Sequence, residues 1–480
     1  MPEKPNILLI NVDDLGWKDL TCMGSSFYET PNIDKLAKEG VLYTSGYASA
    51  ANCAPSRANL MTGRYSRRHG VITVGDSERG DEKLRRVIPI PNKSFLPKGI
   101  KTMPEVLKDQ GYFTGMIGKW HITHDPLDNG FFENVAGYDK GMPSSYFAPY
   151  NNPALDDGEE GEYLPERLSL EVCSFLDRHK DETWFLYYAT YLVHTPIQGK
   201  DEVTEKYRKR LEQNGNEDGQ ANPVYAAMVE ALDDAVGKVI DKLEELGLSD
   251  NTLVVFTSDN GGIRTISDQY PLRAGKGSYY EGGIRVPLIM RWPNQIKANS
   301  FSHEPITNLD FLPTFLNLAG GDARNGEWDG DDISNTFLQS KNEPCKERSL
   351  FWDFPVYLGP YDSERDDGRD VLFRTRPGAT LRHGDWKIHY YYEDQSYELY
   401  NLRLDIGERM DLSKTEFAKL EQLKNLLKGK MDEVGASMTL ANNPKYEARF
   451  EKDRSAAVQA AEEPKPQSEK EWYQAMSFID

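Results

Sequence analysis

Short runs of apolar residues alternate, over the first two thirds of the chain, with longer stretches in which apolar residues recur at helical spacing. This alternation is typical of α/β proteins with a largely parallel sheet. The pattern predicts strands at residues 6–12, 112–117, 184–190, 252–257 and 284–290, and helices at residues 31–39, 104–110, 165–179, 223–246 and 310–318. We therefore expect an α/β fold with a large, mostly parallel central sheet flanked by helices.

The pattern changes near residue 349, where aromatic strand-like runs follow one another at short intervals. They lie at residues 350–354, 371–375, 386–392 and 397–400. Short spacing favours antiparallel pairing. A helix is predicted at residues 414–434, and the chain beyond residue 442 is polar and expected to run over the surface. The sequence thus predicts a larger domain at residues 1–348 and a smaller C-terminal α+β subdomain at residues 349–480, with an antiparallel sheet, a helix and a polar tail.

Composition excludes two classes of protein. The chain has 480 residues and a formal net charge of −20, whereas nucleic-acid binding needs clustered cations. The longest apolar stretch, residues 184–193, is about half a membrane span, so no membrane-spanning segment is expected. The chain enters its first strand almost at once, without room for a secretory signal. We expect a cytoplasmic protein, or a periplasmic or secreted one if a signal has been removed.

Cysteine use draws attention to one position. The chain has four widely spaced cysteines and no CxxC pair, so neither a zinc site nor a disulfide framework is indicated. The four are Cys22, Cys53, Cys173 and Cys345. Only Cys53 has an informative context, because Pro55 is a preferred first residue of a helix and Arg57 is basic. We expect Cys53 to lie in a positive environment and the other three to be ordinary thiols.

Carboxylates follow two of the predicted strands. Asp13 and Asp14 come directly after strand 6–12, and Asp259 and Asn260 come directly after strand 252–257. The carboxyl ends of parallel strands form the ligand-binding edge of such a sheet. Each pair alone is also typical of a turn. Together, however, they offer only oxygen ligands, which indicates one hard divalent cation such as Ca²⁺ or Mg²⁺.

Cations follow other strands. Lys119 and His121 end the segment at residues 111–121, His194 follows strand 184–190, and Lys276 lies between two glycines. Isolated lysines and histidines are usually structural or exposed. Four of them at the sheet edge that carries the carboxylates predict a pocket for a tetrahedral anion. His124 is a weaker candidate for contact with the substrate.

Two motifs resemble the signatures of type I sulfatases of the alkaline phosphatase superfamily: Cys53-x-Pro55-Ser56-Arg57 and residues 111–121. The resemblance implies that a maturation enzyme converts Cys53 to formylglycine, whose hydrate is the nucleophile. It also implies the remaining roles. Asp13, Asp14, Asp259, Asn260 and the converted Cys53 would bind the metal, with Ca²⁺ preferred to Mg²⁺, Arg57 would steady the hydrate, and Lys119, His121, His194 and Lys276 would hold the sulfate or assist the leaving group.

The expected function is hydrolysis of a sulfate ester on a carbohydrate, such as an oligosaccharide of an algal polysaccharide or a glycosaminoglycan. Two alternatives remain open at this point. One is a phosphonate or phosphate ester hydrolase of the same superfamily. The other is a catalytically silent protein that binds sulfated glycans with Cys53 unconverted.

Overall fold

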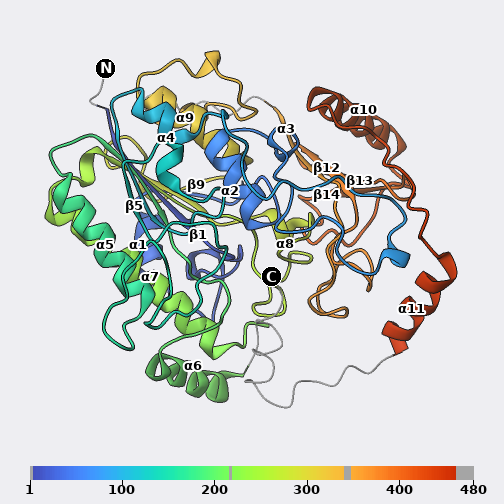
Figure 1. Cartoon of the computed structure of the whole chain (residues 1–480), viewed down its shortest axis with the longest axis horizontal. Helices are drawn as coiled ribbons and strands as arrows, with labels where there is room; N and C mark the ends of the chain where they lie inside the picture. Colours follow the sequence, from blue (N-terminus) through green and yellow to red (C-terminus); the bar gives the residue numbers. More distant parts are fainter. Residues whose placement is uncertain (1–3, 216–218, 340–346, 461–480) are drawn as a thin grey trace.

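The computed structural model describes residues 4–215, 219–339 and 347–460. Its centre is an eight-stranded sheet in which β8 runs antiparallel to both neighbours while every other pair is parallel (Figure 1). In spatial order the strands are β5 (Glu133–Val135), β4 (Phe113–Gly118), β6 (Trp184–Ala189), β1 (Asn6–Val12), β7 (Thr252–Ser258), β8 (Leu288–Arg291), β2 (Val41–Tyr43) and β9 (Ser300–Ser302). The expected mostly parallel α/β sheet is confirmed.

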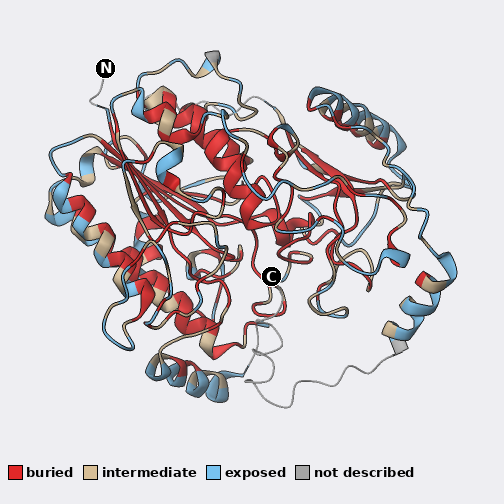
Figure 2. Cartoon of the chain, in the orientation of Figure 1, coloured by how far each residue is buried: buried red, intermediate tan, exposed pale blue. Residues whose placement is uncertain are grey.

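Helices cover both faces of this sheet. One face carries α1 (Pro31–Lys38), α5 (Leu164–Arg178), α6 (Asp201–Asn214) and α7 (Pro223–Glu245), and the other carries α2 (Cys53–Thr62), α4 (Met103–Lys108) and α9 (Phe311–Leu318). Two one-turn helices, α3 (Ser66–His69) and α8 (Glu281–Ile284), lie in connecting segments. Figure 2 shows that the central strands of the sheet and α2 are buried.

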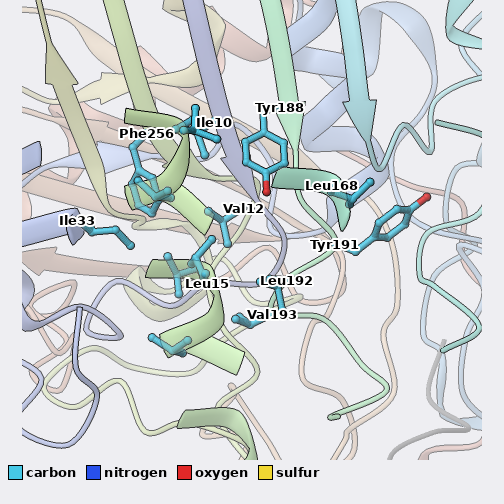
Figure 3. Packing of buried hydrophobic residues seen from close by; sticks show 14 of the residues in the cluster. Ile10, Val12, Leu15, Ile33, Leu168, Tyr188, Tyr191, Leu192, Val193 and Phe256 are labelled. Carbon is cyan, nitrogen blue, oxygen red and sulfur yellow. The ribbon is translucent and has the colours of Figure 1, made fainter. Parts of the chain in front are cut away.

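Alternation along β1 explains why the sheet has two cores. Side chains of successive strand residues point to opposite faces. Leu8, Ile10 and Val12 accordingly pack in one apolar cluster, and Ile7 and Leu9 pack in the other. Figure 3 shows Ile10 and Val12 within the first cluster. Burial on both sides fixes the position of β1, and therefore of the residues that follow it.

The C-terminal part forms a separate antiparallel sheet, as expected. Its strands lie in the order β11 (Ser349–Phe354), β12 (Gly378–His383), β13 (Trp386–Tyr391) and β14 (Tyr397–Asn401). Helix α10 (Phe417–Glu433) packs on this sheet through Leu420, Leu423 and Leu427. A small parallel pair, β3 (Gly46–Tyr47) with β10 (Ile306–Thr307), completes the strands of the described residues. The division at residues 348 and 349 remains a prediction.

Buried charges join the C-terminal sheet to the larger part of the molecule. The Glu281 carboxylate of α8 accepts hydrogen bonds from Lys387 Nζ at 2.8 Å and from the Tyr47 hydroxyl at 2.6 Å. Burial raises the pKa of Glu281, but Lys387 and Arg285 outweigh it, and the net effect lowers that pKa to about 2. The carboxylate therefore stays ionised and holds α8 against β13.

Two local predictions were wrong. Residues 371–375 form no strand, because Leu372 and Phe373 pack in an apolar cluster with Leu84, Val87 and Tyr357. The strand that pairs with β11 is instead β12, in which a glycine, an arginine and a histidine obscure the strand pattern. The strand predicted at 284–290 begins only at Leu288, since residues 281–284 form α8 and Pro287 has no N–H to donate. Beyond residue 442 the chain forms α11 (Ala448–Ala460), whose described side chains are mostly exposed or half-buried, in agreement with a polar segment at the surface.

Some predictions fall outside the described residues. Cys345 and the polar tail at residues 461–480 are among them. Cys22 and Cys173 are free thiols, as expected. Within residues 4–215, 219–339 and 347–460, none of the helices is both long and apolar enough to span a membrane.

Candidate active site

Pairing of two central strands brings the first carboxylates together. Val12 lies opposite Ser258 in the parallel β1–β7 pair, so Asp13 and Asp259 leave the same edge of the sheet. The Asp259 N–H donates to the Val12 carbonyl at 3.0 Å. Asp14 has a φ of 61°, and its N–H donates to Asp259 Oδ1 at 3.2 Å. The local backbone thus directs the carboxylates of Asp13, Asp14 and Asp259 into one buried site.

The neighbouring strands β4 and β6 deliver cationic side chains to the same edge. Lys119 follows β4 directly, and its N–H donates to the carbonyl of Ala189, the last residue of β6. The segment after β6 is tied to β1, because the Asp13 N–H donates to the Leu192 carbonyl at 2.8 Å. His194 lies two residues further on and is also buried. Register between parallel strands therefore gathers residues that are far apart in sequence.

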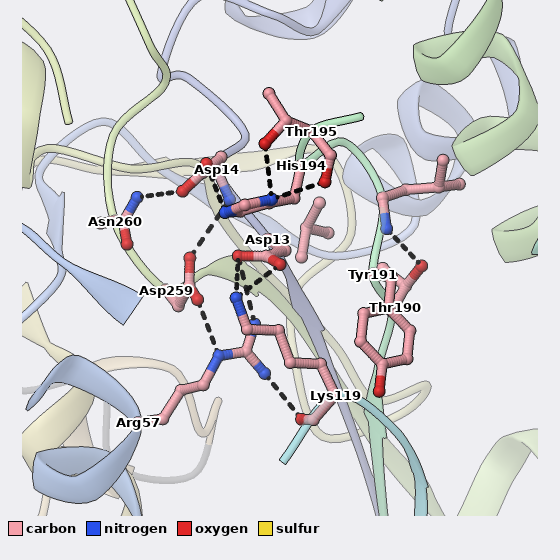
Figure 4. Close-up of polar contacts among 12 residues, drawn as sticks. Asp13, Asp14, Arg57, Lys119, Thr190, Tyr191, His194, Thr195, Asp259 and Asn260 are labelled. Carbon is pink, nitrogen blue, oxygen red and sulfur yellow. Dashed lines mark hydrogen bonds and ion pairs between the residues drawn. The ribbon is translucent and has the colours of Figure 1, made fainter. Parts of the chain in front are cut away.

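Three ion pairs organise the centre of the site, and Figure 4 shows two of them, Lys119 with Asp13 and Arg57 with Asp259. Lys119 Nζ donates to both oxygens of Asp13, at 2.9 and 2.7 Å. Arg57 Nε donates to Asp259 Oδ2 at 2.7 Å, and Lys276 Nζ donates to Asp14 Oδ2 at 2.9 Å. The three positive charges thus balance the three negative charges of the carboxylates. An added divalent cation would leave the site positive and suited to an anion.

The pKa values of the adjacent carboxyls of Asp13 and Asp14 shift in opposite directions. Burial is the largest effect on Asp13 and, despite the opposing charge of Lys119, raises its pKa to about 7. Burial also acts on Asp14, but Lys276, His194 and Lys119 outweigh it, so the pKa of Asp14 is lowered. Asp14 is accordingly the more firmly ionised of the pair.

Cys53 begins α2 and is only 2% exposed, at the centre of this cluster. Its Sγ and one oxygen each of Asp13 and Asp259 lie within 4.8 Å of one another. Burial, together with these carboxylates, raises the pKa of the thiol to about 11 against the opposing charges of Lys119 and Lys276. At neutral pH roughly 10⁻⁴ of the side chain would be thiolate. The surroundings are thus of mixed charge, and the unmodified thiol is a poor nucleophile.

Hydrogen bonds define the state of His194. Its Nδ1 lies 2.8 Å from the Thr195 carbonyl oxygen, which can only accept, so Nδ1 carries the proton. Its Nε2 lies 3.0 Å from Lys276 Nζ and accepts from that ammonium group. His194 and Lys276 therefore form one hydrogen-bonded pair beside Asp14.

The donor set fits a hard cation. Asn260 Nδ2 donates to Asp14 Oδ1 at 2.7 Å, while Asn260 Oδ1 is buried without a hydrogen-bond partner. An unsatisfied buried carbonyl oxygen is costly unless a cation or another donor binds it. With three carboxylates close by, this oxygen completes an all-oxygen ligand set of the kind that Ca²⁺ and Mg²⁺ prefer.

The other two predicted histidines differ in their surroundings. His121 has a φ of 63°, and its ring packs against Gly141, where a Cβ would come within 2.4 Å of it. The His124 side chain is 73% exposed; its Nδ1 lies 2.9 Å from Asp139 Oδ2, and its ring contacts that of Phe95 at a tilt of 48°. Contact of either histidine with a substrate remains a prediction.

Tyr187 is a site residue that the sequence did not indicate. It lies within β6, and its hydroxyl is the shared partner of Asn11 Nδ2 at 2.9 Å and of Arg57 Nη1 at 3.4 Å. A tyrosine inside an apolar strand is usually core packing. Nothing in the local pattern distinguishes this one, because its partners come from other elements.

Comparisons with known proteins agree with this site. A family model described as Sulfatase matches residues 5–321, and one described as N-sulphoglucosamine sulphohydrolase, C-terminal, matches residues 275–437. A protein named Sulfatase from Formosa agariphila is 32% identical over 483 residues, covering 85% of this chain and 84% of its own length. N-acetylgalactosamine-6-sulfatase from Homo sapiens is 30% identical over 452 residues, covering 88% and 78%.

A solved structure extends the likeness to three dimensions. The crystal structure of Ps i-CgsB in complex with k-i-k-neocarrahexaose matches with a TM-score of 0.72 and 30% identity, covering 96% of this chain and 98% of that one. The Sulfatase model alone spans well over half of the chain and includes both sequence motifs. The chain therefore belongs to the type I sulfatases of the alkaline phosphatase superfamily and is a sulfuric ester hydrolase.

Proposed function

We propose that this enzyme removes sulfate from a sulfated carbohydrate, using Cys53 converted to formylglycine and one divalent cation. The observation that carries the proposal is the convergence on buried Cys53 of three carboxylates and three cations from five separate segments. Burial raises the pKa of the Cys53 thiol to about 11, so conversion to formylglycine would supply the nucleophile that this thiol does not.

Members of this family generally use a metal ion and a formylglycine. We assign the metal of this chain to Asp13, Asp14, Asp259, Asn260 and residue 53. Three carboxylates and an amide oxygen favour Ca²⁺, because Mg²⁺ usually keeps several waters and takes one or two carboxylates. A formylglycine hydrate would supply an oxygen nucleophile, and the cation would supply positive charge for the sulfate oxygens.

Arg57, Lys119 and Lys276 orient the metal-binding carboxylates and offset their negative charge. Arg57 holds Asp259 and, at 3.7 Å, Asp13, so it orients two metal-binding carboxylates at once. Lys119 pairs with Asp13, and Lys276 pairs with Asp14, so the two lysines place positive charge on both of these adjacent carboxylates. Preorganised cations of this kind stabilise charge that develops on a transferring group. They would hold the sulfate and neutralise it during cleavage.

The His194–Lys276 pair is the proposed proton donor to the leaving oxygen. Replacing His194 with alanine should lower kcat by about 10²-fold for an alkyl or sugar sulfate, the usual scale for general acid catalysis. The loss should be much smaller for a nitrophenyl sulfate, whose leaving group needs no proton. The double variant His194→Ala/Lys276→Ala should be little worse than either single variant, because the two act as a unit.

A matched control is available in His69, which is equally buried but is bound to Asn59 away from the carboxylates. His69→Gln should leave the dependence on leaving group unchanged. If His194→Ala lowers kcat equally for the sugar sulfate and the nitrophenyl sulfate, the His194–Lys276 pair is not the proton donor.

The carbohydrate part of the proposal is supported by the relatives. One is named for the 6-sulfate of N-acetylgalactosamine, and another was solved with a carrageenan hexaose. Sulfate and phosphate esters of the same sugar, assayed in parallel with converted, metal-loaded enzyme, test the class of reaction. Sulfate release should exceed phosphate release by several orders of magnitude. A preference for the phosphate ester would instead support a phosphohydrolase, and binding without release of either anion would support a silent glycan-binding protein.

A further inference from the structure

Asp19 carries a fully buried carboxyl group in the segment that follows Asp14. Its two oxygens accept five hydrogen bonds from neutral donors, which are the Gly16 N–H at 2.9 Å and the side chains of Gln220, Tyr225, Ser267 and Gln269 at 3.2, 2.6, 2.6 and 2.7 Å. Burying a carboxyl group among neutral groups costs free energy, and an apolar side chain would fill the position without that cost. The hydrogen bonds themselves are therefore what Asp19 contributes.

Gln269 joins Asp19 to the second segment that carries a metal-binding residue. It lies between Asn260 and Lys276, in the chain that follows β7, whereas Asp19 lies in the chain that follows β1. Gln269 binds the first segment twice, because its Nε2 donates to Asp19 Oδ1 at 2.7 Å and its Oε1 accepts from the Lys18 N–H at 2.8 Å. Asp19 and Gln269 thus tie the two segments together.

The two segments also meet through close backbone packing. A Cβ on Gly16 would come within 2.3 Å of the Gln269 side chain. A Cβ on Gly262, which comes two residues after Asn260, would lie 3.1 Å from Gly16 and 3.3 Å from the carbonyl oxygen of Asp14. This packing links the positions of Asp14 and Asn260, whose side chains are also hydrogen-bonded to each other at 2.7 Å.

We propose that Asp19 is a positioning residue for the divalent cation. Through Gly16 and Gln269 it keeps two ligands, Asp14 and Asn260, at the spacing that the cation requires. This inference rests on the proposed function, because that function assigns the cation to these residues and their neighbours. Hydrogen-bonded groups behind metal ligands commonly change metal affinity by about 10- to 100-fold. We expect an effect near the lower value, since Asp19 acts on the ligands through intervening residues.

The alternative is that Asp19 only stabilises the fold. Its hydrogen bonds from Gln220 and Tyr225, at the start of α7, would serve that purpose. A fold-stabilising residue would change the unfolding temperature and leave the metal affinity of the folded protein unchanged. A positioning residue would change the metal affinity, and excess metal would restore turnover, because Asp19 acts on the metal ligands and not on the substrate.

The test is calorimetric titration of Ca²⁺ into full-length, converted protein from which a chelator has removed metal. Asp19→Asn keeps the size of the side chain but turns an amide N–H toward a group that can only donate, the Gly16 N–H or the Gln269 amide nitrogen. The Kd for Ca²⁺ should rise by about tenfold or more, while kcat at saturating Ca²⁺ should stay close to the parental value. Gln269→Ala should also raise the Kd, and the double variant should be little worse than either single variant, because the two residues act as a unit.

Asp233→Asn is the matched control. Asp233 is also buried, and it also accepts hydrogen bonds from neutral groups, the N–H groups of Asn32 and Ile33. The control may not disturb the segments after β1 and β7, so its Kd for Ca²⁺ should equal that of the parent even if its unfolding temperature is lower.

The two failures are distinguishable. An unchanged Kd in folded Asp19→Asn, or in Gln269→Ala if Asp19→Asn does not fold, would overturn the positioning role and leave the metal assignment intact. An equal rise of the Kd in Asp233→Asn, or a kcat that saturating Ca²⁺ does not restore, would also overturn it. Wild-type protein that binds neither Ca²⁺ nor Mg²⁺ would overturn the metal assignment and the positioning role together.

Discussion

The Cys53→Ser protein is expected to fold normally and to lose turnover of sulfate esters by about 10⁴-fold or more, the scale reached when the nucleophile of a covalent mechanism is removed. Serine is close in volume to cysteine, so α2 and its contacts should be kept. It carries one hydroxyl, however, and lacks a second oxygen on the same carbon with which to release a bound sulfuryl group. Steady-state assays and thermal unfolding of the purified variant measure both effects.

Cys173→Ser provides the matched control, because Cys173 is another free thiol, lying in α5. It should retain parental turnover and stability. Near-parental turnover by Cys53→Ser would show that the reaction does not depend on residue 53.

The Asp14→Ala protein is expected to lose its divalent cation and about 10³-fold or more of its turnover together, because the metal supplies several kcal/mol of charge stabilisation. The change removes one ligand and also the acceptor of Lys276 and Asn260. Elemental analysis of the dialysed protein gives the metal content, and the same preparation is assayed for sulfate release.

Asp233→Asn is the control, since Asp233 is as deeply buried as Asp14 but accepts hydrogen bonds from Asn32 and Ile33 at the start of α1. It should keep metal and turnover. Stoichiometric metal in Asp14→Ala, or full activity in chelated enzyme shown to be metal-free, would contradict the ligand assignment.

The central part of the site could be predicted because its residues directly follow apolar strands. Asp13 and Asp259 each come one residue after a strand of the parallel sheet, and Lys119 does the same after β4. A buried strand has a readable pattern, and parallel pairing forces its carboxyl end to one edge. Position in sequence therefore translates almost directly into position in space for these side chains.

The rest of the site depends on contacts between distant elements, which leave no local pattern. Tyr187, for example, lies within the apolar strand β6 and resembles a core residue. Tyr187 acquires its place in the site only through a contact with Arg57, which lies 130 residues away in the sequence. Tertiary packing, and not local propensity, decides such positions.

The most direct test of the central claim is mass spectrometry of the peptide that carries Cys53, in preparations made with different amounts of a formylglycine-generating enzyme, alongside kcat per mole of protein. We predict that kcat rises in proportion to the fraction of peptide in which the thiol has been replaced by an aldehyde, and that it extrapolates to zero for the unconverted chain. A fully active preparation in which every Cys53 peptide still carries a thiol would contradict the account.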